Sequence, residues 1–158
     1  MCAQVSPNPF QQAVYNTPSL GQNAYRPGLR ALGGNSSKVQ VRNCKLLGSV
    51  YLEETFYLEG AIQSARWDYG IGIQNGDDAR AVWVEVHPAD TSRVKEVIQK
   101  LKWLKEWLAT NAPALHKLTP PDAYYWIASD GVHITPNSHQ ARSLAEAGLK
   151  MPRRVLVL

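Results

Sequence analysis

Cysteine is scarce in this chain, with only Cys2 and Cys44 among 158 residues. They form no C-x-x-C pair and have no histidine cluster beside them, so the sequence predicts no zinc site and does not require a disulfide. Apolar runs are also short. No segment approaches the roughly 20 apolar residues of a membrane-spanning helix, and the first residues lack the pattern of a secretory signal. We therefore expect a cytoplasmic protein without a membrane partner.

Acidic residues are absent from the first 37 positions, which are rich in Pro, Asn, Gln, Ser and Gly. The apolar residues in this segment follow no period. A segment of this kind buries too little surface to offset the entropy lost on ordering. Residues 1–37 are therefore predicted to be a flexible or loosely packed N-terminal arm. Residues 38–158 have a globular pattern and are predicted to form a single domain.

The charge balance is mildly positive. Lysine and arginine number 17 against 13 acidic residues, which gives a net charge of +4 and an isoelectric point of about 9.1. This balance permits contact with nucleic acid or another polyanion without requiring it. The hydrophobic fraction of 44% and the charged fraction of 19% are ordinary for a soluble globular domain.

Two strands are predicted in the centre of the chain, at 67–74 and 81–87. Both segments contain β-branched and aromatic residues. The polar residues 75–78 between them begin with Asn-Gly, which supplies the positive φ angle of a tight hairpin turn. Further upstream, apolar residues at three- and four-residue spacing favour a helix, broken or continuous, over roughly residues 43–63.

The clearest predicted element is a long helix after the second strand. Asp90, Thr91 or Ser92 can cap its N-terminus, and it should end near 111–113 because proline disfavours helix in the preceding residue. A single apolar stripe at helical spacing marks its buried face. The stripe consists of Val94, Val97, Ile98, Leu101, Leu104 and Leu108.

The rest of the chain alternates between strands and a short helix. The predicted elements are a buried strand at 124–128, its continuation or hairpin partner at 132–134, a helix at 139–147 and a last strand at 154–158. Ser138 or Asn137 can cap the short helix, and Gly148 can end it. This alternation predicts an α/β fold, a mixed sheet flanked by helices, in which the long helix is a crossover between parallel strands.

Three polar residues lie on the two central strands. Asp68 opens the first strand, and Glu85 and His87 lie on the second with the same strand parity. A charged side chain in an apolar strand is costly to bury and usually has a partner, a ligand or a catalytic task. Two carboxylates are also what Mg²⁺ commonly takes from a protein, together with water. The structural alternative is that Asp68 caps its strand or pairs with Arg66 or Arg93.

The order of elements, with Asp68 opening one strand and Glu85-Val86-His87 on the next, resembles the PD-(D/E)xK, or restriction-endonuclease-like, superfamily over roughly residues 43–158. The resemblance implies a nuclease that holds Mg²⁺ or Mn²⁺ and activates water against a phosphodiester. It also implies that Asp68 and Glu85 are metal ligands and that Glu59, or less favourably Glu54, is a further acid from a preceding helix.

His87 stands where that superfamily has a lysine. A histidine there could act as a base, as a ligand or as an oxyanion stabiliser. The long helix offers two lysines as replacements. Lys95 lies one turn into the helix and is a catalytic candidate, whereas Lys105 lies beside the apolar stripe and is better explained as a residue whose stem covers apolar surface. A smaller departure is Trp67 before the aspartate, where proline is usual.

Trp103 and Trp107 lie four residues apart on the long helix and share one face. Measured from Val94, this face is opposite the apolar stripe, and Lys100 and Glu96 lie on it too. Two exposed tryptophans would form a partner surface, a homodimer contact or a base-stacking platform. The alternative is that the N-terminal segment or a second chain covers them.

Three functions are therefore compatible with the sequence. The first is a metal-dependent nuclease that acts through Asp68, Glu85 and His87. The second is a catalytically inactive domain on the same fold that binds a partner through Trp103 and Trp107. The third is a small-molecule binder with no nucleic-acid role. Only the modest positive charge of the chain argues against this third function.

Overall fold

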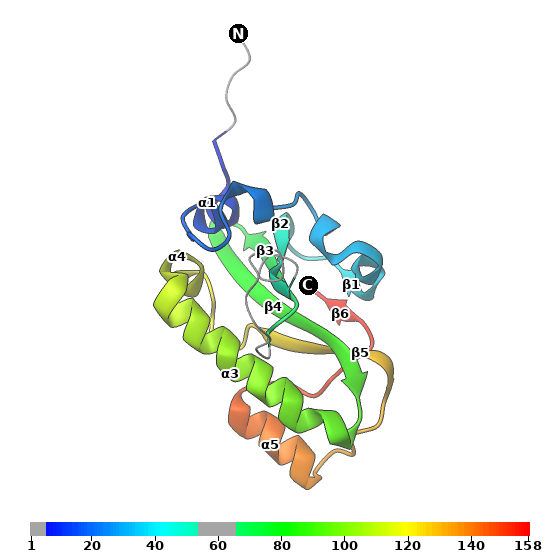
Figure 1. The fold of residues 1–158 in the computed structure, drawn as a ribbon. Helices are drawn as coiled ribbons and strands as arrows, with labels where there is room; N and C mark the ends of the chain where they lie inside the picture. Colours follow the sequence, from blue (N-terminus) through cyan, green and yellow to red (C-terminus); the bar gives the residue numbers. More distant parts are fainter. Residues whose placement is uncertain (1–5, 54–65) are drawn as a thin grey trace.

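The protein is a mixed α/β domain built on a four-stranded sheet, shown in Figure 1. This computed structural model describes residues 6–53 and 66–158. The strands are adjacent in chain order, β2-β3-β4-β5. β2 is antiparallel to β3, β3 is antiparallel to β4, and β4 is parallel to β5. Within the part of the chain that is described, none of the helices has the length and apolar character needed to cross a bilayer.

β2 (Lys45–Tyr51) is a strand where the sequence predicts a helix over 43–63, so that prediction is wrong for the strand residues. The pairing of β2 with β3 contains a register irregularity between Leu46 and Gly48. A bulge of this kind interrupts the two-residue alternation, which leaves apolar spacings that resemble a helix. Gly48 has φ +144°, and a Cβ there would lie 2.3 Å from the Tyr25 ring. Residues 54–63 of the predicted helix lie outside the described residues.

The central hairpin is confirmed. β3 (Tyr69–Asn75) and β4 (Asp78–Ala89) pair from Tyr69 opposite Val84 to Asn75 opposite Asp78. Gly76 in the turn has φ +57°, the left-handed conformation that favours glycine. β4 is longer than the predicted strand at 81–87 at both ends, and Glu85 and His87 lie within the predicted part.

The crossover from β4 to β5 is also confirmed. A 3₁₀ turn, η3 (Thr91–Arg93), leads into α3 (Val94–Asn111), and the short α4 (Pro113–Lys117) follows directly. β5 (Tyr124–Val132) then returns parallel to β4. Residues 124–132 form one strand, so the segment at 132–134 begins as a continuation of it and not as a hairpin partner.

α5 (His139–Ala147) packs beside α3 along one side of the sheet (Figure 1). Its predicted caps are present, because the Ser138 side chain accepts the backbone N–H of Ala141 and Gly148 adopts the left-handed conformation. β6 (Leu156–Val157) is shorter than the predicted strand at 154–158. It pairs in parallel with β1 (Val39–Gln40) in a separate two-stranded sheet.

The predicted loose arm is wrong for residues 6–37. This segment folds into α1 (Pro9–Tyr15) and two 3₁₀ helices, η1 (Gln22–Ala24) and η2 (Arg30–Lys38). The buried side chains that it contributes to the common core include Phe10, Val14, Leu20 and Leu32. Phe10 and Val14 lie on the short α1, whereas Leu20 and Leu32 come from separate turns, so the segment as a whole shows no period in the sequence. Residues 6–37 therefore share one core with the residues that follow, and the predicted boundary at residue 38 does not mark a loosely attached segment.

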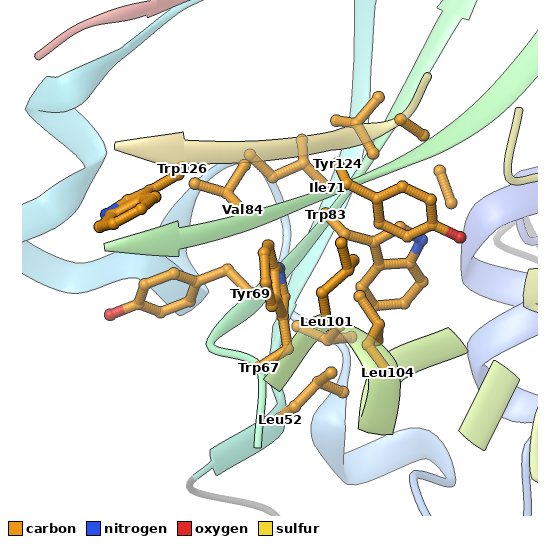
Figure 2. Close-up of a cluster of buried hydrophobic side chains, with 14 of the residues drawn as sticks. Leu52, Trp67, Tyr69, Ile71, Trp83, Val84, Leu101, Leu104, Tyr124 and Trp126 are labelled. Carbon is orange, nitrogen blue, oxygen red and sulfur yellow. The ribbon is translucent and has the colours of Figure 1, made fainter. Parts of the chain in front are cut away.

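The core between the sheet and α3 is rich in large side chains (Figure 2). Trp67 and Trp83 from the β3–β4 region lie close to Leu101 and Leu104 of α3, and all four are almost completely buried. Full burial of each leucine side chain contributes roughly 1.5–3 kcal/mol to the stability of the fold. This packing fixes the rotation of α3 against β4, and that rotation places the functional groups described next.

Candidate functional site

The candidate site lies where β3 and β4 part. The regular ladder ends at Tyr69 opposite Val84, and beyond it side chains replace the backbone pairing. Oδ2 of Asp68 accepts the backbone N–H of Val86 at 2.9 Å. In return, Oε1 of Glu85 accepts the backbone N–H of Asp68 at 3.0 Å. The sequence correctly predicts that the two acids meet on adjacent strands, and each carboxylate is bound to the backbone of the opposite strand.

A lysine reaches this site from α3. Nζ of Lys100 lies 2.6 Å from Oε2 of Glu85. The Glu85 side chain is fully buried and that of Lys100 is 15% exposed, so the contact is a largely desolvated ion pair. Charges buried in this way are tolerated in a folded protein only when they are paired and hydrogen-bonded.

The two lysines named from the sequence lie elsewhere. Lys95 is exposed, and helix geometry places it about 140° around α3 from Lys100. Lys105 is exposed too, and its Nζ donates to the Ala147 carbonyl at 2.9 Å and lies 5.1 Å from the Tyr124 ring centroid. Lys105 therefore binds the C-terminal end of α5 and lies over the Tyr124 ring.

The sequence did contain a signal for Lys100. Its position on the helical wheel is only about 40° from Leu104, at the edge of the apolar stripe. A lysine at the edge of a buried stripe reaches across to the facing strand more readily than one on the exposed side. Angles measured from Val94 hide this signal, because Val94 lies near the centre of the stripe and about 80° from Leu104, so they leave out how far the stripe extends on the Leu104 side.

The same choice of Val94 as the reference for the helical-wheel angles explains the wrong placement of Trp107. Trp107 is 6% exposed and Trp103 is half-buried, so the rings are covered, and the predicted position opposite the stripe is wrong for Trp107. Trp107 lies about 60° from Leu104 on the wheel and not opposite the stripe. Its ring packs edge-on against Trp83 at 6.3 Å and is stacked on Trp103 at 5.9 Å. The sheet of the same domain covers this face of α3, and no second chain is needed to bury Trp107.

His87 links the buried acid to a more exposed one. Its Nδ1 lies 3.9 Å from Oε2 of Glu85, and its Nε2 lies 3.4 Å from Oε2 of Glu96. Arg93 contacts the same Glu96 oxygen at 3.4 Å, so it is paired with Glu96 and not with Asp68 as the structural alternative proposed. Burial and the charge of Lys100 lower the pKa of His87, which favours a neutral imidazole at pH 7.

Burial raises the pKa of both carboxyl groups, those of Asp68 and Glu85. Burial, and to a smaller extent the nearby Glu53, raise the pKa of Asp68 to about 6 against the opposing effects of the Val86 N–H and Lys100. Burial and the charge of Asp68 raise the pKa of Glu85 well above its usual value. Burial opposes the charge on Lys100, but Glu85 outweighs it and raises the lysine pKa. Burial thus outweighs the effect of Lys100 on both carboxyl groups.

The donor chemistry fits a hard divalent cation. Mg²⁺ is usually held by one or two carboxylates together with water, and Asp68 and Glu85 provide two buried ones. An added cation would also favour the ionised form of both carboxyl groups, which burial disfavours. In the described residues, no three His, Cys, Asp or Glu side chains gather as a metal-binding group. Glu59 and Glu54, the predicted further acids, lie outside the residues that the structure describes.

Comparison of the chain with protein-family models, with curated proteins and with solved structures found no match to any of them.

Proposed function

We propose that the protein is a metal-dependent nuclease, or a diverged relative of one, with a restriction-endonuclease-like fold. The observation that carries this proposal is the meeting of Asp68, Glu85 and Lys100 at one buried point. Two acids and a lysine form the chemical set of the PD-(D/E)xK resemblance. In this chain the lysine comes from α3 and not from the second position after Glu85.

The arrangement of elements supports the same proposal. The acids lie on an antiparallel hairpin, and a crossover helix leads from it to a parallel neighbouring strand. This is the order on which the resemblance rests from Asp68 onward. A catalytic set is recognised by geometry and roles and not by sequence position, so a lysine contributed by α3 can do the same work.

Each residue would have a distinct role. Asp68 and Glu85 would hold Mg²⁺ or Mn²⁺, and the bound ion would polarise the phosphodiester and lower the pKa of a water molecule. Lys100 would donate hydrogen bonds to the attacking water or to a phosphate oxygen. Its three N–H groups permit this while one of them still contacts Glu85.

His87 would act beside this set. The Glu96 carboxylate facing Nε2 favours the tautomer that carries its proton on that nitrogen, and this leaves the Nδ1 lone pair toward Glu85. A neutral imidazole in that orientation can accept a proton. His87 therefore replaces the motif lysine in position only, and Lys100 replaces it in charge.

The test is cleavage of plasmid and single-stranded DNA and RNA with Mg²⁺ or Mn²⁺. We expect Asp68→Asn and Glu85→Gln to abolish cleavage, and Lys100→Met to reduce it by on the order of 10²-fold or more. Lys95→Met is the matched control, because it removes an exposed charge from the same helix and should cleave like wild type. Equal activity in Lys100→Met and Lys95→Met would contradict the assigned role of Lys100.

A second candidate is an inactive domain in which these groups form a structural network. It is favoured by the fact that both oxygens of Glu85 already have donors, the Asp68 N–H and Lys100. Its expected result is a folded wild-type protein that cleaves none of the substrates with either metal. The partner surface first assigned to it through Trp103 and Trp107 loses its basis, because Trp107 is buried within the domain.

A further inference from the structure

A second group of charged residues lies at β5, the edge strand of the sheet. Tyr125 on β5 is half-buried, and two cations lie over its ring. Nζ of Lys150 is 4.8 Å from the ring centroid, and Cζ of Arg153 is 5.9 Å from it. We call Tyr125, Lys150 and Arg153 the β5 cation cluster.

The cluster is held in place by the backbone. The N–H of Arg153 donates to the carbonyl of Trp126, and the carbonyl of Arg153 accepts the N–H of Ala128. Residue 153 thus forms a parallel bridge with β5. Both cationic side chains are exposed at their ends although the base of the cluster is ordered. Less side-chain entropy is lost when such a group binds a ligand.

The cations of this cluster form no ion pair with the described residues. In the ranges 6–53 and 66–158, no carboxylate lies within 4.0 Å of the charged nitrogens of Lys150, Arg153 or the adjacent Arg154. The last eleven residues of the sequence, 148–158, contain these three cations and no acidic side chain. Charge complementarity therefore favours a polyanion at this surface.

The cluster lies one strand away from the candidate site. Tyr125 is paired with Val84, and Trp126 with Glu85. Tyr124 contacts Lys105 of α3, so strand alternation places Tyr125 on the opposite face of the sheet from α3. Glu85 contacts Lys100 of α3, so the cluster and the candidate site lie on opposite faces of the sheet.

We propose that the β5 cation cluster binds the phosphate backbone of nucleic acid. The choice of nucleic acid among polyanions rests on the function proposed above. Lys150 and Arg153 each contact a phosphate, and Tyr125 holds the two cations at a fixed position. The contacts are to the backbone and carry no sequence preference.

The experiment is fluorescence anisotropy of a labelled short single-stranded oligonucleotide in EDTA, where metal-dependent cleavage does not occur. We expect the double variant Lys150→Gln/Arg153→Gln to bind about tenfold more weakly at moderate salt. The slope of log K against log[salt] should fall by about 1.4, because each lost contact to a single strand removes about 0.7. Lys45→Gln/Lys117→Gln is the matched control, with the same change in net charge at two other exposed lysines.

Equal binding by the two double variants would overturn the proposal, and so would a wild-type protein that binds phosphatidylserine vesicles but no oligonucleotide. Lys150→Arg/Arg153→Lys keeps both charges and should restore binding, which separates loss of contact from loss of fold. Asp68→Asn should bind like wild type but not cleave. An Asp68→Asn protein that still cleaves would contradict the nuclease site and leave the binding surface intact.

Discussion

Asp68 and Glu85 each accept a backbone N–H from the strand that carries the other, at 2.9 and 3.0 Å. The two acids therefore continue the β3–β4 ladder beyond the last regular pair. Their carboxylates have a structural task in addition to any catalytic one.

Replacing Asp68 by asparagine should stabilise the protein at neutral pH. The amide oxygen can still accept the Val86 N–H, and the buried charge is removed. The pKa of Asp68 is raised to about 6 in the folded protein, so the folded state binds protons more tightly than the unfolded state. This carboxylate therefore destabilises the fold above that pKa and ceases to do so below the unfolded value of about 3.9.

We expect Asp68→Asn to raise the free energy of unfolding by about 1–3 kcal/mol at pH 8 in EDTA, and by much less at pH 4. Denaturant unfolding of both proteins at the two pH values measures this. A variant that is less stable than wild type at pH 8 would show that the hydrogen bond to Val86 outweighs the burial of charge.

Replacing Lys100 should destabilise the fold even if the protein has no catalytic activity. Loss of its ammonium leaves Glu85 buried without its cation, and breaking a buried pair from one side costs about 3–5 kcal/mol. The double variant Lys100→Met/Glu85→Gln should lose less than the sum of the single variants, because neither charge is then left alone. A thermal or urea double-mutant cycle, with Lys95→Met as control, measures the coupling, and additive effects would argue against the pair.

Divalent cations should stabilise the wild-type protein selectively. A ligand that binds only the folded state adds about 2.7 kcal/mol at 100 times its dissociation constant. We expect Mg²⁺ or Mn²⁺ to raise the melting temperature of wild type but not that of Asp68→Asn/Glu85→Gln. Differential scanning fluorimetry with a Na⁺ series of equal ionic strength separates binding from screening. An equal rise in both proteins would argue against metal ligation by these acids.

The N-terminal segment should contribute to global stability. Phe10 is fully buried, and a Cβ added at Gly72 would lie 2.2 Å from its ring. Phe10→Ala should cost about 3–5 kcal/mol through the cavity that it leaves. Gly72→Ala should also destabilise the fold, whereas Gly34→Ala, where a Cβ meets nothing within 4 Å, should not. Limited proteolysis of residues 6–37 checks the same point, and rapid cleavage in wild type would contradict it.

Local pattern predicted the elements whose signals are strong and short-ranged. The turn at Gly76, the caps of α5 and the end of α3 depend on backbone geometry that particular residues impose. β2 was mistaken for helix because the bulge next to Gly48 disturbs its alternation. The packing of Phe10 and Leu32 was missed because it depends on contacts between segments far apart in the sequence, and no periodicity records these contacts.

The candidate site was predicted in part for a similar reason. Asp68 and Glu85 lie on paired strands, so strand order alone brings them together. Lys100 comes to the same point through the rotation of α3, which is set by the packing of Leu101, Leu104 and Trp107 against the sheet. A sequence pattern defines that rotation only to within the angular width of the apolar stripe. It therefore does not show that Lys100, and not Lys95, is the lysine that reaches the site.

The placement of Lys100 on α3 has a consequence for the recognition of relatives. The three site residues are separated by fixed intervals, since Glu85 follows Asp68 by 17 positions and Lys100 follows Glu85 by 15. One residue inserted between β4 and α3 would turn the helix by about 100° and advance it by about 1.5 Å, which takes the lysine away. Relatives with the same site should therefore tolerate length changes in the β3–β4 turn, provided the register is kept, but not in the short β4–α3 connection. A search for an acid, a second acid on the paired strand and a lysine two turns into the next helix would find chains that a search for acid-x-lysine overlooks.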